Sequence, residues 1–159
     1  MLQRRDKTDI HEEDQNHAHR MERTVEALQS KGFRLTPHRE AVHAYLASVG
    51  YHPTAEEVYL AVKAQGSRLS LATVYNALEA LVEAGLASKL AFGDGSARYD
   101  IRTDQHDHVH CLGCGMLRDL PPLLRRDSLG DVSEEGFQVT GYRLELIGYC
   151  AACRQRYSR

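Results

Sequence analysis

The sequence has no long apolar run, no export signal and no large excess of charge, and each absence excludes a class of protein. No stretch approaches the about 18 consecutive apolar residues of a membrane span, so we expect no membrane partner. No apolar segment followed by a cleavage site marks a secretory signal, so a cytoplasmic location is predicted. The formal net charge of −2 is not typical of a constitutive nucleic-acid binder. If DNA is the partner, basic side chains must gather locally or metal must change the charge.

Cysteine is scarce, but its spacing is regular. The four cysteines form two C-x-x-C pairs, Cys111 with Cys114 and Cys150 with Cys153. Without an export signal, such pairs indicate metal binding rather than a disulfide framework. Four thiolates suit a closed tetrahedral site, so we predict a structural Zn²⁺ that staples a small domain. The alternatives are a redox disulfide or unconnected cysteines; a redox C-x-x-C usually opens a helix after a strand, and neither pair is expected there.

A second set of potential ligands offers nitrogen and oxygen donors without sulfur. His106 and His108 lie two residues apart, so an extended strand points both to one face. With His52, Asp100 and Asp119 they form a set that favours Fe²⁺ or Mn²⁺, although Zn²⁺ would also bind. By spacing alone only the two neighbouring histidines form a chelate, because a lone histidine such as His52 is usually a surface or capping residue. A metal bound by all five would clamp one domain against the other.

Helical patterns dominate the chain up to Gly85. A first helix runs from Met21 to Gly32, and Thr36, Thr54 and Ser70 are each expected to cap a further helix. Residues 87–92 and 97–101 form a hairpin signal across a glycine-rich turn. Short helices followed by a two-stranded wing are the plan of a winged helix-turn-helix, whose helix 70–84 would enter the major groove of DNA.

Helix 70–84 has two contrasting faces. An apolar stripe follows helical spacing, whereas the other face carries the small and polar residues Ala72, Thr73, Asn76 and Ala80, with Tyr75 at the border. Such a face can approach another surface closely. The alternative is an ordinary amphipathic core helix, which periodicity alone does not exclude.

After Asp100 the pattern becomes that of strands, so the fold class is α+β. Strands are expected at 106–110, 115–120, 137–140 and 142–148, with a helix from Pro121 toward Leu129. We predict a flexible N-terminal arm over 1–20, a winged-helix domain over 21–101, a hinge over 102–105 and a metal-binding domain over 106–159. The histidines of the arm are interpreted as part of a solvated tail rather than as ligands.

Several motifs in one order resemble the ferric uptake regulator (Fur) superfamily from about Gly32 to Cys153. They are Arg34–Arg39, His52–Tyr59, Ser70–Asn76, the run His106–Gly115 and the pair Cys150/Cys153. The resemblance implies an N-terminal winged-helix DNA-binding domain and a C-terminal α/β dimerisation domain. It also implies a metal-dependent transcriptional repressor, not an enzyme, that binds double-stranded operator DNA as a homodimer.

The resemblance also implies roles for particular residues. Zinc bound by the four cysteines is structural, and the five histidine and aspartate ligands form the regulatory Fe²⁺ or Mn²⁺ site. Tyr75 and its helix, with Thr73 and Asn76, would contact operator bases, and Arg34 would approach the neighbouring minor groove. In many members a third metal site exists, but here Gln105 and Tyr142 stand where histidines are expected, and only Asp107 of that site is present.

Aspartate at both Asp100 and Asp119 resembles the peroxide-sensing PerR branch, since iron-sensing members commonly have glutamate there. In that branch Fe²⁺ reacts with peroxide, a histidine ligand is oxidised and DNA is released, whereas Mn²⁺ supports repression without that chemistry. A manganese- or iron-uptake regulator without peroxide sensing is the alternative, because the same ligands hold either metal. A zinc-uptake regulator is disfavoured, since its site usually includes a cysteine and all four are committed.

The sequence is also compatible with two other functions, an enzyme and a protein-binding module. A non-haem iron enzyme needs open coordination positions and a substrate pocket, for which five ligands leave little room. A structural zinc module that binds a protein partner predicts no dependence on Fe²⁺ or Mn²⁺. His110, beside Cys111, is interpreted as a strand residue in preference to an additional ligand.

Overall fold

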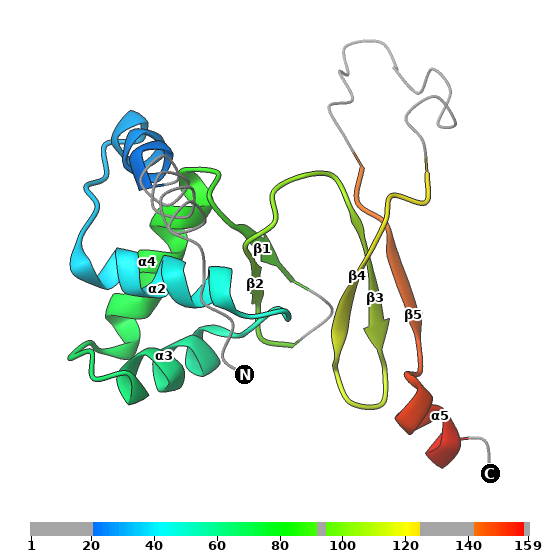
Figure 1. The fold of residues 1–159 in the computed structure, drawn as a ribbon. Coiled ribbons are helices and arrows are strands. Elements are labelled where there is room, and N and C mark those ends of the chain that lie inside the picture. The colour runs from blue at the N-terminus through cyan, green and yellow to red at the C-terminus, as the bar shows by residue number, and fades with distance from the viewer. Residues whose placement is uncertain (1–20, 92–94, 125–141, 158–159) are drawn as a thin grey trace, which may run out of the picture. The chain divides into compact units, whose positions relative to one another are not determined.

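A computed structural model describes residues 21–91, 95–124 and 142–157 of the chain. The chain divides into two compact units, residues 1–103 and 104–159 (Figure 1). Helices predominate in the first unit and strands in the second. The predicted arm over 1–20 and the predicted strand over 137–140 lie outside the described residues. No helix in the described ranges is long and apolar enough to cross a membrane.

Side-chain caps define where the helices of the first unit begin. Helical residues 21–30 are followed by α2 (Pro37–Ser48), α3 (Ala55–Ala64) and α4 (Leu71–Glu83). Thr36 and Ser70 each accept a hydrogen bond from the backbone N–H three residues on, and Thr54 forms a reciprocal capping box with Glu57. After α4, Gly85 has a φ of +69°, the left-handed conformation that ends many helices. The predicted caps are confirmed.

The core of the first unit lies between the helices, because α4 packs against both α2 and α3. Leu46, Leu78 and Leu81 are at most 1% exposed. The predicted division of α4 into faces is wrong at Ala80, which was expected on the open face but is 2% exposed. Contact with two helices makes the buried face of α4 wider than the apolar stripe that the sequence shows.

The predicted hairpin is confirmed as β1 (Ser88–Leu90) paired antiparallel with β2 (Arg98–Asp100). A backbone hydrogen bond of 2.9 Å from Tyr99 N–H to the Pro53 carbonyl fastens β2 to the segment before α3. Thr54 and Arg98 form an isolated bridge between the same segments. These contacts bring His52 and Asp100 together within the first unit.

The second unit is built on a three-stranded sheet with the order β4-β3-β5. The central strand β3 (Asp107–Cys111) pairs antiparallel with β4 (Leu117–Leu120) and parallel with β5 (Glu145–Gly148). These strands confirm three of the predicted ones, with shifted ends. The helix expected from Pro121 does not begin within the described residues, since 121–124 are not helical, and 125–129 lie outside them.

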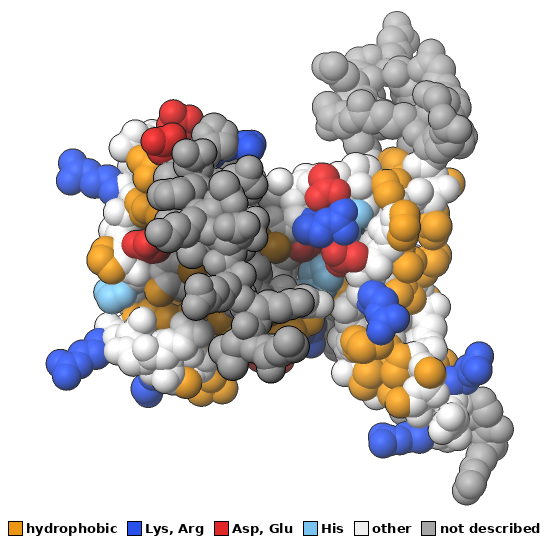
Figure 2. Space-filling model, in the orientation of Figure 1, with side chains coloured by type: hydrophobic (Ala, Val, Ile, Leu, Met, Phe, Trp, Pro, Cys, Tyr) orange, Lys and Arg blue, Asp and Glu red, His pale blue; other side chains and the backbone are white. Residues whose placement is uncertain are grey.

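A short helix, α5 (Ala151–Tyr157), follows β5 and was not predicted. Its seven residues are too few to show an amphipathic period. Large apolar side chains are exposed beside it: Leu146 is 39% exposed, Ile147 66% and Tyr149 45%. Figure 2 shows hydrophobic side chains gathered on the β5 side of this unit. An exposed apolar strand of this kind indicates an interaction surface.

Candidate metal centres

The four cysteines meet at one end of the second unit. Cys111 ends β3, Cys114 lies in the following turn, Cys150 follows β5 and Cys153 lies in α5. Their sulfur atoms all lie within 4.8 Å of one another, and Cys114 and Cys150 are separated by 3.9 Å. Zn–S bonds of about 2.3 Å in a tetrahedron place sulfurs about 3.8 Å apart. The arrangement therefore fits structural zinc.

Backbone geometry prepares the turn for this site. Gly115 has a φ of +69°, and its N–H donates to the Cys111 carbonyl over 2.8 Å, which closes the C-x-x-C turn. The Cys150 N–H donates to the Cys111 sulfur over 3.2 Å. This hydrogen bond is the largest cause that lowers the pKa of Cys111 to about 6. The hydrogen bond of Cys153 with Cys150 is the largest cause that raises the pKa of Cys153 to about 12.

The lowered pKa of Cys111 and the raised pKa of Cys153 indicate that one thiolate is stabilised among neighbouring thiols. Gathering four sulfurs disfavours ionising all of them, because like charges at short range repel. A divalent cation reverses this balance and deprotonates coordinating thiols. The donor set is thus adapted to a cation of the zinc type.

The second C-x-x-C pair does not lie where the sequence predicted, because it was not expected to open a helix after a strand. Cys150 and Cys153 do open a helix, α5, after the strand β5, which is the placement expected of a redox C-x-x-C. All four cysteines are nevertheless free thiols. The sulfur separation of 3.9 Å between Cys114 and Cys150 far exceeds the about 2.05 Å of a disulfide. Proximity of all four sulfurs, not helix placement, is what favours metal.

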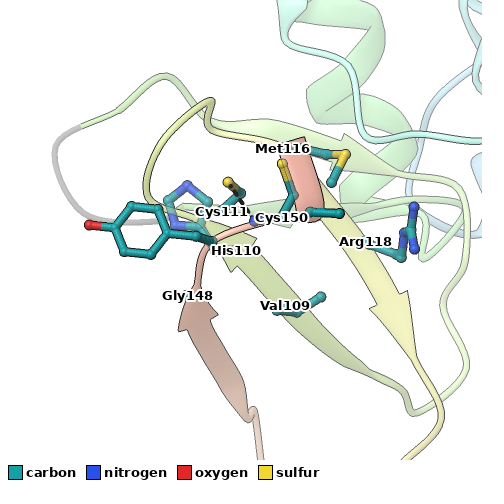
Figure 3. Close-up of a pocket in the computed structure, with 9 residues that line it drawn as sticks. Val109, His110, Cys111, Met116, Arg118, Gly148 and Cys150 are labelled. Carbon is teal, nitrogen blue, oxygen red and sulfur yellow. Dashed lines mark hydrogen bonds between the residues drawn. The ribbon is translucent and has the colours of Figure 1, made fainter. Parts of the chain in front are cut away.

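A shallow pocket of about 270 Å³ lies beside the cysteines (Figure 3). Met116, Arg118 and Tyr149 are among its lining residues, as are Cys111 and Cys150. The lining is largely apolar, and apolar surroundings of this kind set the solvent access and the local dielectric constant of a metal site.

Three of the nitrogen and oxygen ligands come together in the second unit. The Nε2 atoms of His106 and His108 lie 3.1 Å apart, and Asp119 Oδ1 lies 3.9 and 3.8 Å from them. Asp119 is the direct cross-strand partner of His108, which explains why β4 brings it there. Asp104 places its carbonyl 2.7 Å from His106 Nδ1 and so fixes the orientation of that ring.

The other two ligands come together in the first unit. His52 Nε2 lies 3.5 Å from Asp100 Oδ2, and both residues are 5% exposed. The Asp100 Oδ1 atom accepts a hydrogen bond of 2.8 Å from Arg102 N–H. Arg98 donates through Nη1 to the His52 carbonyl over 2.8 Å. Each unit therefore holds a preformed group of nitrogen and oxygen donors that fits Fe²⁺ or Mn²⁺.

Residues 30–147 match the Ferric uptake regulator family. The chain belongs to this family. It is 38% identical over 141 residues to the Peroxide operon regulator of Bacillus subtilis, covering 87% of this chain and 97% of that protein. Family members are DNA-binding homodimeric regulators, and the winged-helix plan of the first unit is the one that the family shares.

Two solved structures are similar to this chain over most of its length. The ferric uptake regulator of Pseudomonas aeruginosa with manganese is 27% identical, with a TM-score of 0.67 over 80% of this chain and 98% of that one. The Campylobacter jejuni peroxide stress regulator is 30% identical, with a TM-score of 0.59 over 74% of this chain and 89% of that one. Both likenesses span most of each chain.

Of the residues expected to contact DNA, Arg34, Tyr75 and Asn76 are exposed, and Thr73 is half-buried. Thr73, Tyr75 and Asn76 lie on the first half of α4, and Tyr75 is 40% exposed. Thr73 Oγ1 lies 2.8 Å from the hydroxyl of Ser70, the residue that caps α4. Arg34 is exposed just before α2, and its carbonyl accepts from Arg39 Nη1 over 2.6 Å.

The residues at the position of the third metal site form hydrogen bonds within the second unit. Asp107 is fully buried, and its Oδ2 accepts from Leu123 N–H over 2.6 Å. Gln105 Nε2 donates to the Tyr142 carbonyl over 3.2 Å, and the Tyr142 hydroxyl donates to the Leu124 carbonyl. These residues link the ends of the segments on both sides of the undescribed range 125–141.

Two partners of the candidate ligands were not predicted from the sequence. His110 lies in β3 as expected, but its Nδ1 is 3.3 Å from Glu145 Oε1, a partner the sequence did not suggest. The contact of Arg98 with His52 joins residues that are 46 apart in the chain. No local motif signals either pair, because both depend on strand pairing between distant segments.

Proposed function

We propose that this chain is a metal-dependent transcriptional repressor that binds operator DNA as a homodimer and responds to peroxide. In this proposal one Fe²⁺ or Mn²⁺ ion is bound by His52, Asp100, His106, His108 and Asp119, and Zn²⁺ by the four cysteines. The single observation that supports it best is the donor set, in which each unit contributes nitrogen and oxygen ligands and none contributes sulfur.

The coordination number of the metal favours one shared ion. The first unit offers one imidazole and one carboxylate, and the second offers two imidazoles and one carboxylate. Neither set completes the about six ligands that Mn²⁺ prefers, whereas the two sets together nearly do. We propose that sharing the ion fixes the angle between the units, so that both recognition helices of a dimer reach successive major grooves.

Charge supports metal control of DNA binding. The formal net charge is −2, and Asp100 and Asp119 add negative charge at the proposed site. When bound, the divalent cation neutralises these carboxylates and, as Fe²⁺, supplies the reducing electron for reaction with peroxide. His52 and His106 orient their rings toward the carboxylates and would be the side chains exposed to that oxidation. DNA binding places the proposed repressor in the cytoplasm.

The apolar strand β5 supports the proposed homodimer. Leu146, Ile147 and Tyr149 present a large apolar surface beside the cysteine site. Arg34, Thr73, Tyr75 and Asn76 are the proposed DNA contacts, with α4 in the major groove. The relatives that match over most of the chain are regulators, which favours a repressor over the alternative of an iron enzyme.

The decisive experiment is operator binding by zinc-loaded protein, titrated with Mn²⁺ and with Fe²⁺, before and after a peroxide pulse. The probe is an AT-rich inverted repeat from upstream of the protein's own gene. We expect both metals to promote binding, and only the iron form to lose it after peroxide, with one oxygen atom gained at His52 or His106. The exposed His38 on α2 is the internal control and should gain none.

The other outcomes separate the alternatives. Binding that survives peroxide in both metal forms would indicate a manganese- or iron-uptake regulator without peroxide sensing. Binding that is independent of both metals would overturn the proposal and favour a structural zinc module.

A further inference from the structure

Tyr75 is held by a carboxylate from another helix. Its hydroxyl donates to Glu56 Oε1 over 2.7 Å, which joins α4 to the first turn of α3 across 19 residues of sequence. Both residues are exposed, so the contact lies on the surface of the first unit rather than in its core. The proposed function gives Tyr75 a role in reading DNA and gives Glu56 none.

The Glu56 carboxylate lies beside a side chain that is proposed to contact bases, where its negative charge opposes DNA binding. Phosphates carry the negative charge of DNA, so an acidic residue at that surface weakens binding to every sequence. The hydrogen bond from Tyr75 is the largest cause that lowers the pKa of Glu56, so the carboxylate is charged at neutral pH. A charge that opposes binding is retained more readily if it improves discrimination between sequences.

The carboxylate comes from a rigid element. Glu56 is the second residue of α3, whose N-terminus is fixed by the capping box of Thr54 and Glu57. The Thr54 N–H donates to Glu57 Oε2 over 2.7 Å, and the Glu57 N–H donates to the Thr54 hydroxyl over 3.3 Å. An acidic side chain in a first turn is also favoured by the helix dipole. Glu56 can therefore hold a partner side chain in one place.

We propose that Glu56 is a positioning and specificity-determining residue, which holds the Tyr75 ring in its base-contacting orientation and penalises DNA that does not fill that contact. The inference rests on the proposed function, namely sequence-specific operator binding by α4. Fixing the ring before DNA arrives removes the entropic cost of ordering it in the complex. The charge of Glu56 lowers affinity for every sequence, and the positioned ring recovers that loss only where the DNA offers a matching base.

The test is a scan of the operator with the metal-loaded protein. Each thymine is replaced in turn by deoxyuracil, which lacks only the methyl group, and affinity is measured at fixed salt. The penalty at a position is the factor by which affinity falls when its thymine is replaced. The position read by Tyr75 is the one whose penalty is present in the wild type and disappears in Tyr75→Ala. We expect the wild-type penalty there to be on the order of fivefold, the low end of what one base-pair change costs.

Five further variants test the role of the hydrogen bond. Glu56→Ala and Tyr75→Phe should each reduce the penalty at that position to less than about twofold, and the double variant should lose no more than either single one. Glu56→Gln keeps an acceptor for the hydroxyl, so it should retain the penalty while its affinity for non-operator DNA rises. Glu83→Ala removes the same charge from an exposed site at the far end of α4 and should retain the penalty.

The outcomes that overturn the inference differ from those that overturn the proposed function. An intact penalty in Glu56→Ala, or additive effects of Glu56→Ala and Tyr75→Phe, would exclude positioning. A penalty lost as fully in Glu56→Gln as in Glu56→Ala would exclude the hydrogen bond as its cause. If the wild type shows no metal-dependent operator binding, the proposed function fails instead. Zinc content and the unfolding temperature establish that each variant is folded.

Discussion

The Nε2 atoms of His106 and His108 face each other across 3.1 Å. The Asp104 carbonyl can only accept, so the His106 Nδ1 atom beside it donates and, in the neutral ring, leaves Nε2 as a lone pair. His108 must then donate its Nε2 proton, or both nitrogens must bind one cation. Cis ligands about 2.1 Å from an octahedral ion lie about 3.0 Å apart, so the pair already has the spacing of two metal ligands.

Replacing a ligand of this pair should remove the regulatory metal without unfolding the chain. Loss of a residue that only supports a metal ligand lowers metal affinity about 10–100-fold. His106 is itself a proposed ligand, so we expect His106→Ala to lower Mn²⁺ affinity by more than that. Metal-dependent operator binding should be lost, while zinc content stays at one ion per chain. Titration followed by electron paramagnetic resonance measures the Mn²⁺ affinity.

Asp100→Ala provides the matching variant in the first unit. It should lose metal-dependent operator binding to a similar extent, because its carboxylate lies 3.5 Å from His52. Unchanged operator affinity in both variants would contradict a shared regulatory ion.

Arg98→Met should weaken the His52 half of the site indirectly. Arg98 donates to the His52 carbonyl over 2.8 Å and lies 3.5 Å from Glu57, which caps α3. Losing these contacts should lower Mn²⁺ affinity about 10-fold and stability by about 1–2 kcal/mol. Arg98→Lys keeps one charged donor and should recover part of the metal affinity. Metal affinity that does not change in Arg98→Met would contradict a positioning role.

Chelation of zinc should unfold the second unit and leave the first one folded. Cysteines from β3, the following turn, the segment after β5 and α5 hold the second unit together, so the binding free energy of zinc is also folding free energy. Amide resonances of residues 104–124 and 142–157 should collapse, whereas those of 21–91 should keep their dispersion. Cys150→Ser should reproduce the effect without chelator. An unchanged spectrum after zinc removal would contradict a structural role.

Alkaline pH should destabilise the first unit through Tyr99. Burial, followed by the negative charge of Glu79, raises the pKa of Tyr99 from 10.0 to about 12, so the folded state prefers the neutral phenol. This contribution to stability is fully present below pH 10 and is lost as the pH rises toward 12. Tyr99→Phe has no proton to lose, so it should lose about 1–2 kcal/mol less over that range.

Urea unfolding curves at several pH values measure this difference. Tyr59→Phe, at a half-buried position on α3, is the control and should follow the wild type. A Tyr99→Phe profile that parallels the wild type would show that other groups govern alkaline unfolding.

Features that depend on neighbouring residues could be predicted from the sequence. Thr36, Thr54 and Ser70 cap their helices through side chains that reach only three residues ahead, so the motif and the structure coincide. The histidines at 106 and 108 share a face because strand geometry alternates. The hairpin around Gly95 was likewise apparent from its turn and its flanking runs.

Features that depend on distant pairing could not be predicted. The burial of Ala80 follows from two helices packing on α4, and no property of Ala80 itself signals it. Glu56 and Tyr75 meet only because α3 packs on α4, and Arg98 reaches His52 only because β2 lies beside the segment before α3. The helix α5 was missed because a segment of seven residues carries too little periodicity to be recognised.

The parallel pairing of β3 with β5 also has a consequence during synthesis on the ribosome. Residues of the first unit emerge before Asp104, so that unit can fold while the sheet is still incomplete. Strand β5 is made last of the three and must pair with the edge of β3 opposite β4 before Cys150 and Cys153 reach their partners. Parallel pairing over such a distance is slow. Nascent chains should therefore acquire the fold of the first unit before the four cysteines of the second unit can meet around zinc.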